Sequence, residues 1–290
     1  MRPISTRRAL AAIAAAIGCL AASVGPVAPA SAALSPYQPA AQSIRPNSSG
    51  IVGDYVSCPY DSAIVNGGSF TFPGAADSTA LRSSTPTFQG NGWYIDGRTA
   101  PGSALVAFLM CLPPSELADT RLVTATSWSS SNLFKGRSDC PSGTRIYGGG
   151  GFFHEESGPP DPFKGHGLVY ASMPDGNGWF YGAVHDPAYA LTVSARCLPS
   201  DRFVIRQVSS VDVTPTGSNG TAAGVAECQG PFRVLMGGAW WHSFNNWSPS
   251  YSGYLSGSVG ASDQKGWRAA GRSLTPNARM TIIAFCIDLP

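Results

Sequence analysis

Residues 140–154 read CPSGTRIYGGGGFFH, and the same kind of phrase occurs twice more in the chain. Residues 58–72 read CPYDSAIVNGGSFTF, and residues 228–242 read CQGPFRVLMGGAWWH. In each phrase the ninth and tenth residues after the cysteine are glycines, the next residue is small, and the one after it is aromatic. Each phrase is followed by a Gly-Trp pair and then by an apolar run that ends in cysteine. The chain is therefore built from three copies of one unit.

The repeated units favour a fold made of β-strands. Runs of Val, Ile, Tyr, Phe and Thr alternate with segments of Gly, Pro, Asn, Asp and Ser, which is typical of about five short strands per unit joined by turns. We predict an all-β fold of three pseudo-equivalent, disulfide-stapled antiparallel β units at residues 50–113, 114–200 and 201–290. The units are expected to be arranged like a prism around a pseudo-threefold axis. The alternative is three small β domains in series.

Six cysteines follow the N-terminal segment, and the intervals between them alternate in length. An even number of cysteines in an exported chain predicts disulfides. Two pairing schemes treat the three units alike. One scheme closes each unit on itself, and the other links neighbouring units through pairs such as Cys111–Cys140. We favour the first scheme because it makes each unit self-sufficient; its pairs are Cys58–Cys111, Cys140–Cys197 and Cys228–Cys286.

The N-terminal segment has the features of a secretory signal peptide. Basic residues precede an apolar, alanine-rich run, and Ala30-Ser31-Ala32 supplies the small residues that a signal peptidase needs. We therefore predict a signal peptide at residues 1–32, a linker at residues 33–49 and a secreted, extracellular protein.

The charge of the remaining chain and the length of the apolar run argue against two classes of partner. The signal segment holds three of the nineteen Lys and Arg residues and none of the seventeen Asp and Glu residues, which leaves sixteen basic against seventeen acidic residues. A nearly neutral chain lacks the basic surface that phosphate contacts require, so nucleic-acid binding is not expected. The apolar run is also too short and too rich in alanine for a membrane span, so we expect no membrane insertion. The oligomeric state is left open.

The repeated phrase resembles a known pattern. The order Cys-Pro-x-Gly, Gly-Gly-Gly, Gly-Trp, Cys is best matched by Cys140-Pro141-Ser142-Gly143 with Gly148-Gly149-Gly150. It is similar to repeats of secreted bacterial proteins that have no assigned function. Unit 1 lacks the glycine after Pro59, and unit 3 lacks the proline after Cys228. The resemblance implies no activity.

Residues that could carry catalysis are scarce. The chain has no nucleophile elbow and no H-E-x-x-H metal motif, and the repeat accounts for every cysteine beyond the signal. The densest polar cluster, and the only weak catalytic candidate, is His154, Glu155 and Glu156. We expect these residues to lie in a solvated loop rather than in an active site, and we predict neither a cofactor nor a metal.

His154 and His242 occupy equivalent positions in two units, and Phe72 occupies the position in unit 1. Around a threefold axis these side chains would converge, which would suit a metal or a ligand. The simpler alternative is a half-buried strand position that accepts either an aromatic ring or an imidazole, and we favour it.

Aromatic residues are the better indication of function. Trp93, Trp179 and Trp267 recur in every unit and are expected in the core. In unit 3 we expect Trp240 to be core and Trp241 to point to the opposite side of its strand, toward a ligand. The candidate ligand-binding residues are Trp241, Trp247, Tyr251, His242 and Phe153.

These residues predict a secreted, non-enzymatic binding protein of lectin-like type, whose partner is an extracellular glycan or protein. Rigid aromatic side chains supply contact area and lose little entropy on binding. One alternative is a secreted hydrolase or lyase that acts on an extracellular polymer. Another is a protease inhibitor or a cell-surface interaction protein.

Overall fold

The computed structural model describes residues 38–48, 50–58, 63–72, 80–87, 91–99, 103–113, 115, 119–155, 167–216 and 220–288. Within these ranges the regular elements are eighteen β-strands, which confirms the predicted all-β class. The strands belong to one compact unit, Ser31–Pro290. The predicted signal peptide, residues 1–32, lies outside the described residues.

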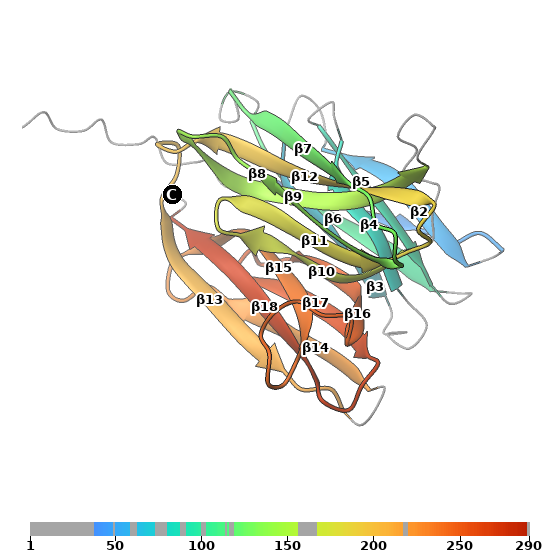
Figure 1. Ribbon diagram of the computed structural model, residues 1–290. Helices are drawn as coiled ribbons and strands as arrows, with labels where there is room; N and C mark the ends of the chain where they lie inside the picture. Colours follow the sequence, from blue (N-terminus) through green and yellow to red (C-terminus); the bar gives the residue numbers. More distant parts are fainter. Residues whose placement is uncertain are drawn as a thin grey trace, which may run out of the picture. The chain divides into compact units, whose positions relative to one another are not determined.

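The strands form three six-stranded sheets (Figure 1). Sheet A has the order β1 (Gln38–Ile44), β6 (Ala104–Leu112), β3 (Ala63–Phe72), β16 (Gly253–Gly260), β17 (Gly266–Ser273) and β14 (Thr221–Glu227). Sheet B has the order β2 (Ile51–Ser57), β5 (Gly92–Arg98), β4 (Ala80–Pro86), β9 (Thr144–Glu155), β12 (Tyr189–Pro199) and β7 (Arg121–Ser127). Sheet C has the order β13 (Ile205–Val213), β18 (Ala278–Ile287), β15 (Arg233–Ser243), β10 (Leu168–Asp175), β11 (Gly178–Val184) and β8 (Leu133–Asp139).

Every sheet combines strands from two repeats. In each repeat the first, third and sixth strands lie in one sheet, and the second, fourth and fifth strands lie in another. Units 1 and 2 share sheet B, units 2 and 3 share sheet C, and units 3 and 1 share sheet A. The expectation of self-sufficient units is therefore wrong, and so is the alternative of three domains in series.

Two details of the predicted units also need correction. Each repeat has six strands rather than five, because two strands and not one precede the first cysteine. The predicted linker, residues 33–49, contains the first of these strands in unit 1. This strand, β1, pairs with β6 over its whole length, and its last residue, Ile44, is buried.

The first glycine of each repeated pair makes room for a tryptophan. A Cβ atom at Gly67 would lie 2.6 Å from the ring of Trp93. The corresponding distances are 2.5 Å for Gly149 and Trp179, and 2.4 Å for Gly237 and Trp267. The glycine and the tryptophan belong to different sheets, so this contact packs the two sheets of a unit together.

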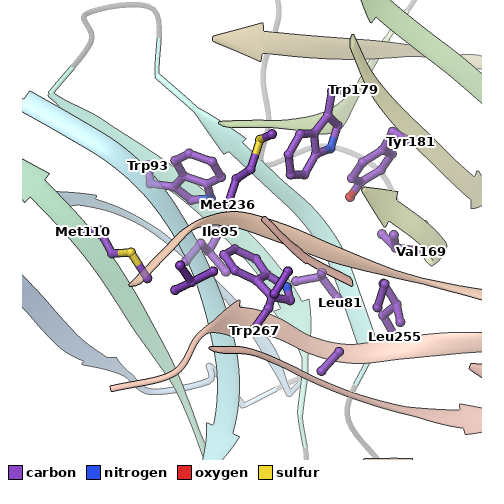
Figure 2. Packing of buried hydrophobic residues seen from close by; sticks show 14 of the residues in the cluster. Leu81, Trp93, Ile95, Met110, Val169, Trp179, Tyr181, Met236, Leu255 and Trp267 are labelled. Atoms are coloured by element: carbon purple, nitrogen blue, oxygen red, sulfur yellow. The ribbon is translucent and has the colours of Figure 1, made fainter. Parts of the chain in front are cut away.

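The three tryptophans form a common part of the core, as predicted. They are 1 or 2% exposed, and Figure 2 shows them in one cluster with Ile95, Met110 and Met236. Each indole N–H donates to a serine hydroxyl on the adjacent strand, which satisfies its buried polar group. The pairs are Trp93–Ser84 (2.9 Å), Trp179–Ser172 (3.2 Å) and Trp267–Ser258 (2.8 Å).

The second glycine of each pair lies where two repeats meet within a sheet. The junctions join β3 to β16, β9 to β4 and β15 to β10. A Cβ atom at Gly150 would lie 1.8 Å from the carbonyl oxygen of Ser84 on the adjoining strand. The distances at the other two junctions are 2.1 Å for Gly68 and Ser258, and 2.3 Å for Gly238 and Ser172. Only glycine permits this approach of the two backbones.

The disulfides fasten sheets to one another. The pairing is the one predicted from the repeat: Cys58–Cys111, Cys140–Cys197 and Cys228–Cys286. In each pair the first cysteine directly follows a strand of one sheet, and the second lies in a strand of another sheet. Each bridge therefore joins the two halves of a repeat that the sheet topology separates.

Candidate functional site

The structure reverses the predicted roles of the adjacent tryptophans in β15. Trp241 is completely buried, whereas Trp240 is partly exposed. Trp241 shares its face of the strand with Gly237 and Ala239, and it packs against the backbone at Gly253. The two tryptophans do point to opposite sides, as the strand period requires, but the side that faces the core is the other one. Trp241 is therefore not a ligand-binding residue.

Phe153 is also part of the core rather than of a binding surface. It occupies the position in β9 that corresponds to Trp241 and is 2% exposed. Its ring stacks on His185, with ring centroids 4.3 Å apart, and meets Phe134 edge-on at 5.2 Å. The prediction that Phe153 contacts a ligand is wrong.

Three exposed aromatic residues belong to the connection between β15 and β16. Phe244 is 60% exposed, Trp247 is 61% exposed and Tyr251 is 37% exposed. We call Phe244 and Trp247, with Arg279 of β18, the Trp247 surface; the ring of Tyr251 lies edge-on to that of Tyr170, with centroids 6.3 Å apart. The guanidinium of Arg279 lies over the ring of Phe244, 4.9 Å from its centroid. Trp247 and Tyr251 were predicted as ligand-binding residues, and their exposure is consistent with that prediction.

The connection that carries the Trp247 surface is held by hydrogen bonds. The indole N–H of Trp240 donates to the carbonyl oxygen of Trp247 (3.1 Å), and the amide of Ser250 donates to the carbonyl of Trp241 (2.8 Å). Asn246 closes the turn, because its side-chain oxygen accepts from the amide of Ser248 (3.0 Å). Burial, with a smaller contribution from Tyr254, raises the pKa of Tyr251 above its ordinary value. The backbone of the connection is therefore held by its own hydrogen bonds.

The indole ring of Trp247 packs on the imidazole ring of His242. The two rings are stacked, with centroids 5.0 Å apart and an angle of 19° between their planes. His242 itself is 1% exposed, so its imidazole is not a surface group; it is a buried ring on which the indole of Trp247 packs. The predicted ligand-binding role of His242 is thus replaced by a role in positioning Trp247.

A chain of hydrogen bonds across sheet C fixes His242. Its Nδ1 donates to the carbonyl oxygen of Ser243 (3.0 Å), and its Nε2 lies 2.9 Å from the hydroxyl of Thr281. Thr281 donates its own proton to the carboxylate of Asp212 on the edge strand. These bonds link the imidazole to three strands of sheet C and hold its orientation.

The equivalent histidine of unit 2 is held in a similar way on sheet B. His154 is 8% exposed, and its Nε2 lies 2.9 Å from the hydroxyl of Thr192, which in turn bonds Thr126 (2.9 Å). An exposed tryptophan, Trp128, lies edge-on to the imidazole with ring centroids 6.3 Å apart. The two histidines thus lie on different sheets, each bonded to a threonine of the neighbouring strand.

This placement bears on the other predictions made for the histidines. His154 and His242 lie on different sheets, and each imidazole contacts an exposed tryptophan of its own, which contradicts the alternative of one shared metal or ligand site at an axis. No cluster of His, Cys, Asp and Glu that could hold a metal occurs among the described residues. Of the weak catalytic candidates, His154 is buried, and Glu156 and the side chain of Glu155 lie outside the described part of the chain.

A buried ion pair, missed in the sequence, lies on sheet B. Nη1 of Arg82 is 3.4 Å from a carboxylate oxygen of Asp96, and both side chains are at most 5% exposed. Nε and Nη2 of Arg82 have no hydrogen-bond partner in the described structure. Burial raises the pKa of Asp96 to about 7, although Arg82 and a backbone hydrogen bond oppose this shift.

We expect this pair to make stability depend on pH. An acid whose pKa is higher in the folded than in the unfolded state binds more protons when folded, so the free energy of unfolding falls as pH rises from about 4 to about 7. The fall has an upper limit of about 4 kcal/mol. Asp96→Asn stays neutral and should abolish the fall. Urea unfolding of both proteins between pH 4 and 8 measures it, and an unchanged slope in the variant would contradict the assignment.

Comparison with known proteins gives no family for the chain. No family model matches it, and no curated protein is significantly similar to it. In the described part of the structure, no helix is long and apolar enough to span a membrane.

Proposed function

We propose that the protein is a secreted, non-enzymatic binding protein that recognises an extracellular polysaccharide through the Trp247 surface. The single observation that carries the proposal is the exposed Trp247, which is stacked on a buried and hydrogen-bonded His242. A sugar ring presents C–H groups on its faces and hydroxyls around its rim. An exposed, immobile indole suits the faces, and neighbouring polar side chains suit the rim.

The surroundings of Trp247 have the polar groups that such a ligand needs. Asn245, Asn246 and Ser248 are exposed on the same connection, and Arg279 lies beside Phe244. Amide and hydroxyl groups both donate and accept hydrogen bonds, as sugar hydroxyls do. Because the connection is already fixed by its own hydrogen bonds, little entropy is lost when a ligand binds.

The location of the protein is part of the proposal. Three disulfides are typical of proteins that fold in an oxidising compartment, and the N-terminal sequence is typical of a signal peptide. We also propose that the three sheets surround a pseudo-threefold axis in the manner of a prism. The threefold repetition of the strand exchange supports this arrangement.

Trp247→Ala is expected to weaken polysaccharide binding at least 30-fold. Loss of a central aromatic contact costs about 2 kcal/mol or more in affinity, and every 1.4 kcal/mol is a factor of about ten. The measurement is retention of the mature chain on cellulose, chitin, xylan and peptidoglycan, followed by a binding isotherm on the retained polymer. Trp247→Phe should keep part of the affinity because it keeps an aromatic face.

Tyr55→Ala is the matched control, since Tyr55 is a 44% exposed aromatic residue on β2, away from this surface. It should bind as the native protein does. Equal binding by the native protein and the Trp247→Ala variant would refute the proposal. Capture of a protein from culture medium that depends on Trp247, without polysaccharide binding, would favour an interaction protein instead.

A further inference from the structure

We propose that the protein has a second ligand-binding site at Trp128, so that it holds two sites for a neutral polysaccharide on two different sheets. The inference rests on the proposed function and deepens it, because two sites select a polymer of recurring sugar units over a short ligand. The observation behind it is that two exposed tryptophans from unlike loops each contact one of the two equivalent histidines, Trp247 by stacking and Trp128 edge-on.

The two tryptophans reach their histidines by different routes. Trp128 directly follows β7, on the connection to β8, whereas Trp247 lies on the connection between β15 and β16. The position in unit 3 that corresponds to Trp128 is Thr214. The repeat therefore does not account for either tryptophan, although it accounts for both histidines. Each histidine thus has an exposed tryptophan beside it, stacked in the case of Trp247 and edge-on in the case of Trp128.

The support beneath the two indoles is alike. Each imidazole is buried, and each Nε2 lies 2.9 Å from a threonine hydroxyl on the adjacent strand. Each threonine continues the chain to the edge strand, to Thr126 in sheet B and to Asp212 in sheet C. Both tryptophans remain more than half exposed on top of this support, at 53% and 61%. Large aromatic side chains that are exposed to solvent and packed on buried residues are typical of ligand-binding surfaces.

The loop that carries Trp128 is also held in place. The hydroxyl of Ser129 bonds that of Ser131 (3.0 Å) and donates to the carbonyl of Leu133 (3.1 Å). The amide of His185 donates to the carbonyl of Asn132 (2.9 Å), which ties the loop to the end of β11. The loop that carries Trp128 is thus hydrogen-bonded, as is the connection that carries Trp247.

The polar groups around both tryptophans point to a neutral ligand. Residues 127–132 read SWSSSN, and residues 243–248 read SFNNWS. Ser130, Ser131 and Asn132 are exposed beside Trp128, as Asn245, Asn246 and Ser248 are beside Trp247. Hydroxyls and amides outnumber charged groups in both loops, which suits sugar hydroxyls better than carboxylates or sulfates.

Two sites on different sheets can raise the affinity for a polymer, because one polymer chain can occupy both. Weak sites that engage one chain together bind it far more tightly than either does alone, by a factor of about 10² to 10⁴ when the geometry allows both contacts. The loss of one site then lowers the affinity for the polymer strongly, while the other site still binds a short fragment with unchanged strength.

The test uses the full mature chain, the polymer that it retains and a soluble five-sugar fragment of that polymer. We expect two fragments per chain for the native protein, one each for Trp128→Ala and Trp247→Ala, and none for the double variant. Trp247→Ala should bind the polymer at least 30-fold more weakly, as stated above, and Trp128→Ala at least ten-fold more weakly. Leu133→Ala is the matched control, since Leu133 is a 43% exposed apolar residue at the end of the same loop, and it should keep two fragments.

The outcomes separate the two proposals. If Trp247→Ala binds no fragment and Trp128→Ala binds as the native protein does, the second site is overturned and the proposed function stands. If the native protein binds none of the polymers, both proposals are overturned. A count of one fragment in each single variant, with native circular dichroism, supports the second site.

Discussion

The middle repeat, residues 114–200, is expected to remain unfolded when it is produced alone. Its strands β7, β9 and β12 belong to sheet B, and β8, β10 and β11 belong to sheet C. In isolation both half-sheets would lose three strands, and the inner strands β9 and β10 would become open edges. The Cys140–Cys197 bridge would join two half-sheets whose apolar faces have lost most of their cover.

The measurement is the amide dispersion and the urea unfolding of the oxidised fragment, compared with those of residues 33–290. We expect poor dispersion and no cooperative transition for the fragment, and one cooperative transition for the long chain. A dispersed spectrum and a sharp transition for residues 114–200 would show that a repeat is self-sufficient, and would contradict the strand exchange.

The sequence predicts the repeat, the strand-rich composition and the disulfide pairing, because each of these depends on local patterns. The strand exchange is different. The alternation along β9 is the same whether the strand pairs with β10 of its own repeat or with β4 of the preceding one. The sequence feature that reflects the exchange of strands between repeats is the second glycine of each pair, Gly68, Gly150 and Gly238. This glycine predicts that another backbone segment packs closely against the strand, but not which segment it is.

The sequence likewise predicts only part of the candidate site. The period of a strand gives the relative direction of Trp240 and Trp241, but it does not say which of them faces the core. Gly237 shows which face of β15 points to the core, because it lies on the same face as Trp241 and packs against Trp267 of another sheet. The support of Trp247 by His242, Thr281 and Asp212 joins three strands that are distant in the sequence. These contacts require the register of sheet C, which composition and spacing do not supply.

Gly150→Ala is expected to destabilise the protein by about 3 kcal/mol or more. The new Cβ would lie 1.8 Å from the carbonyl oxygen of Ser84 and 2.8 Å from Cα of Thr85, both of them backbone atoms. A flexible side chain could move aside, but here the junction between β4 and β9 would have to separate. Overpacking a core costs about 1–3 kcal/mol when side chains can adjust, and more when the backbone must move.

Gly143→Ala is the matched control for the Gly150 substitution, and the free energy of unfolding in urea measures both variants. Nothing lies within 4 Å of a Cβ at Gly143, so the only cost there is its positive φ of 81°, about 1 kcal/mol. A larger loss for Gly150→Ala therefore isolates the contact between repeats from the effect of losing a glycine. Gly68→Ala and Gly238→Ala should resemble Gly150→Ala, because each would bring a Cβ within 2.3 Å of a carbonyl oxygen across its own junction. Losses at these three positions no larger than that of the control would mean that the strands of neighbouring repeats do not approach as closely as the junctions require.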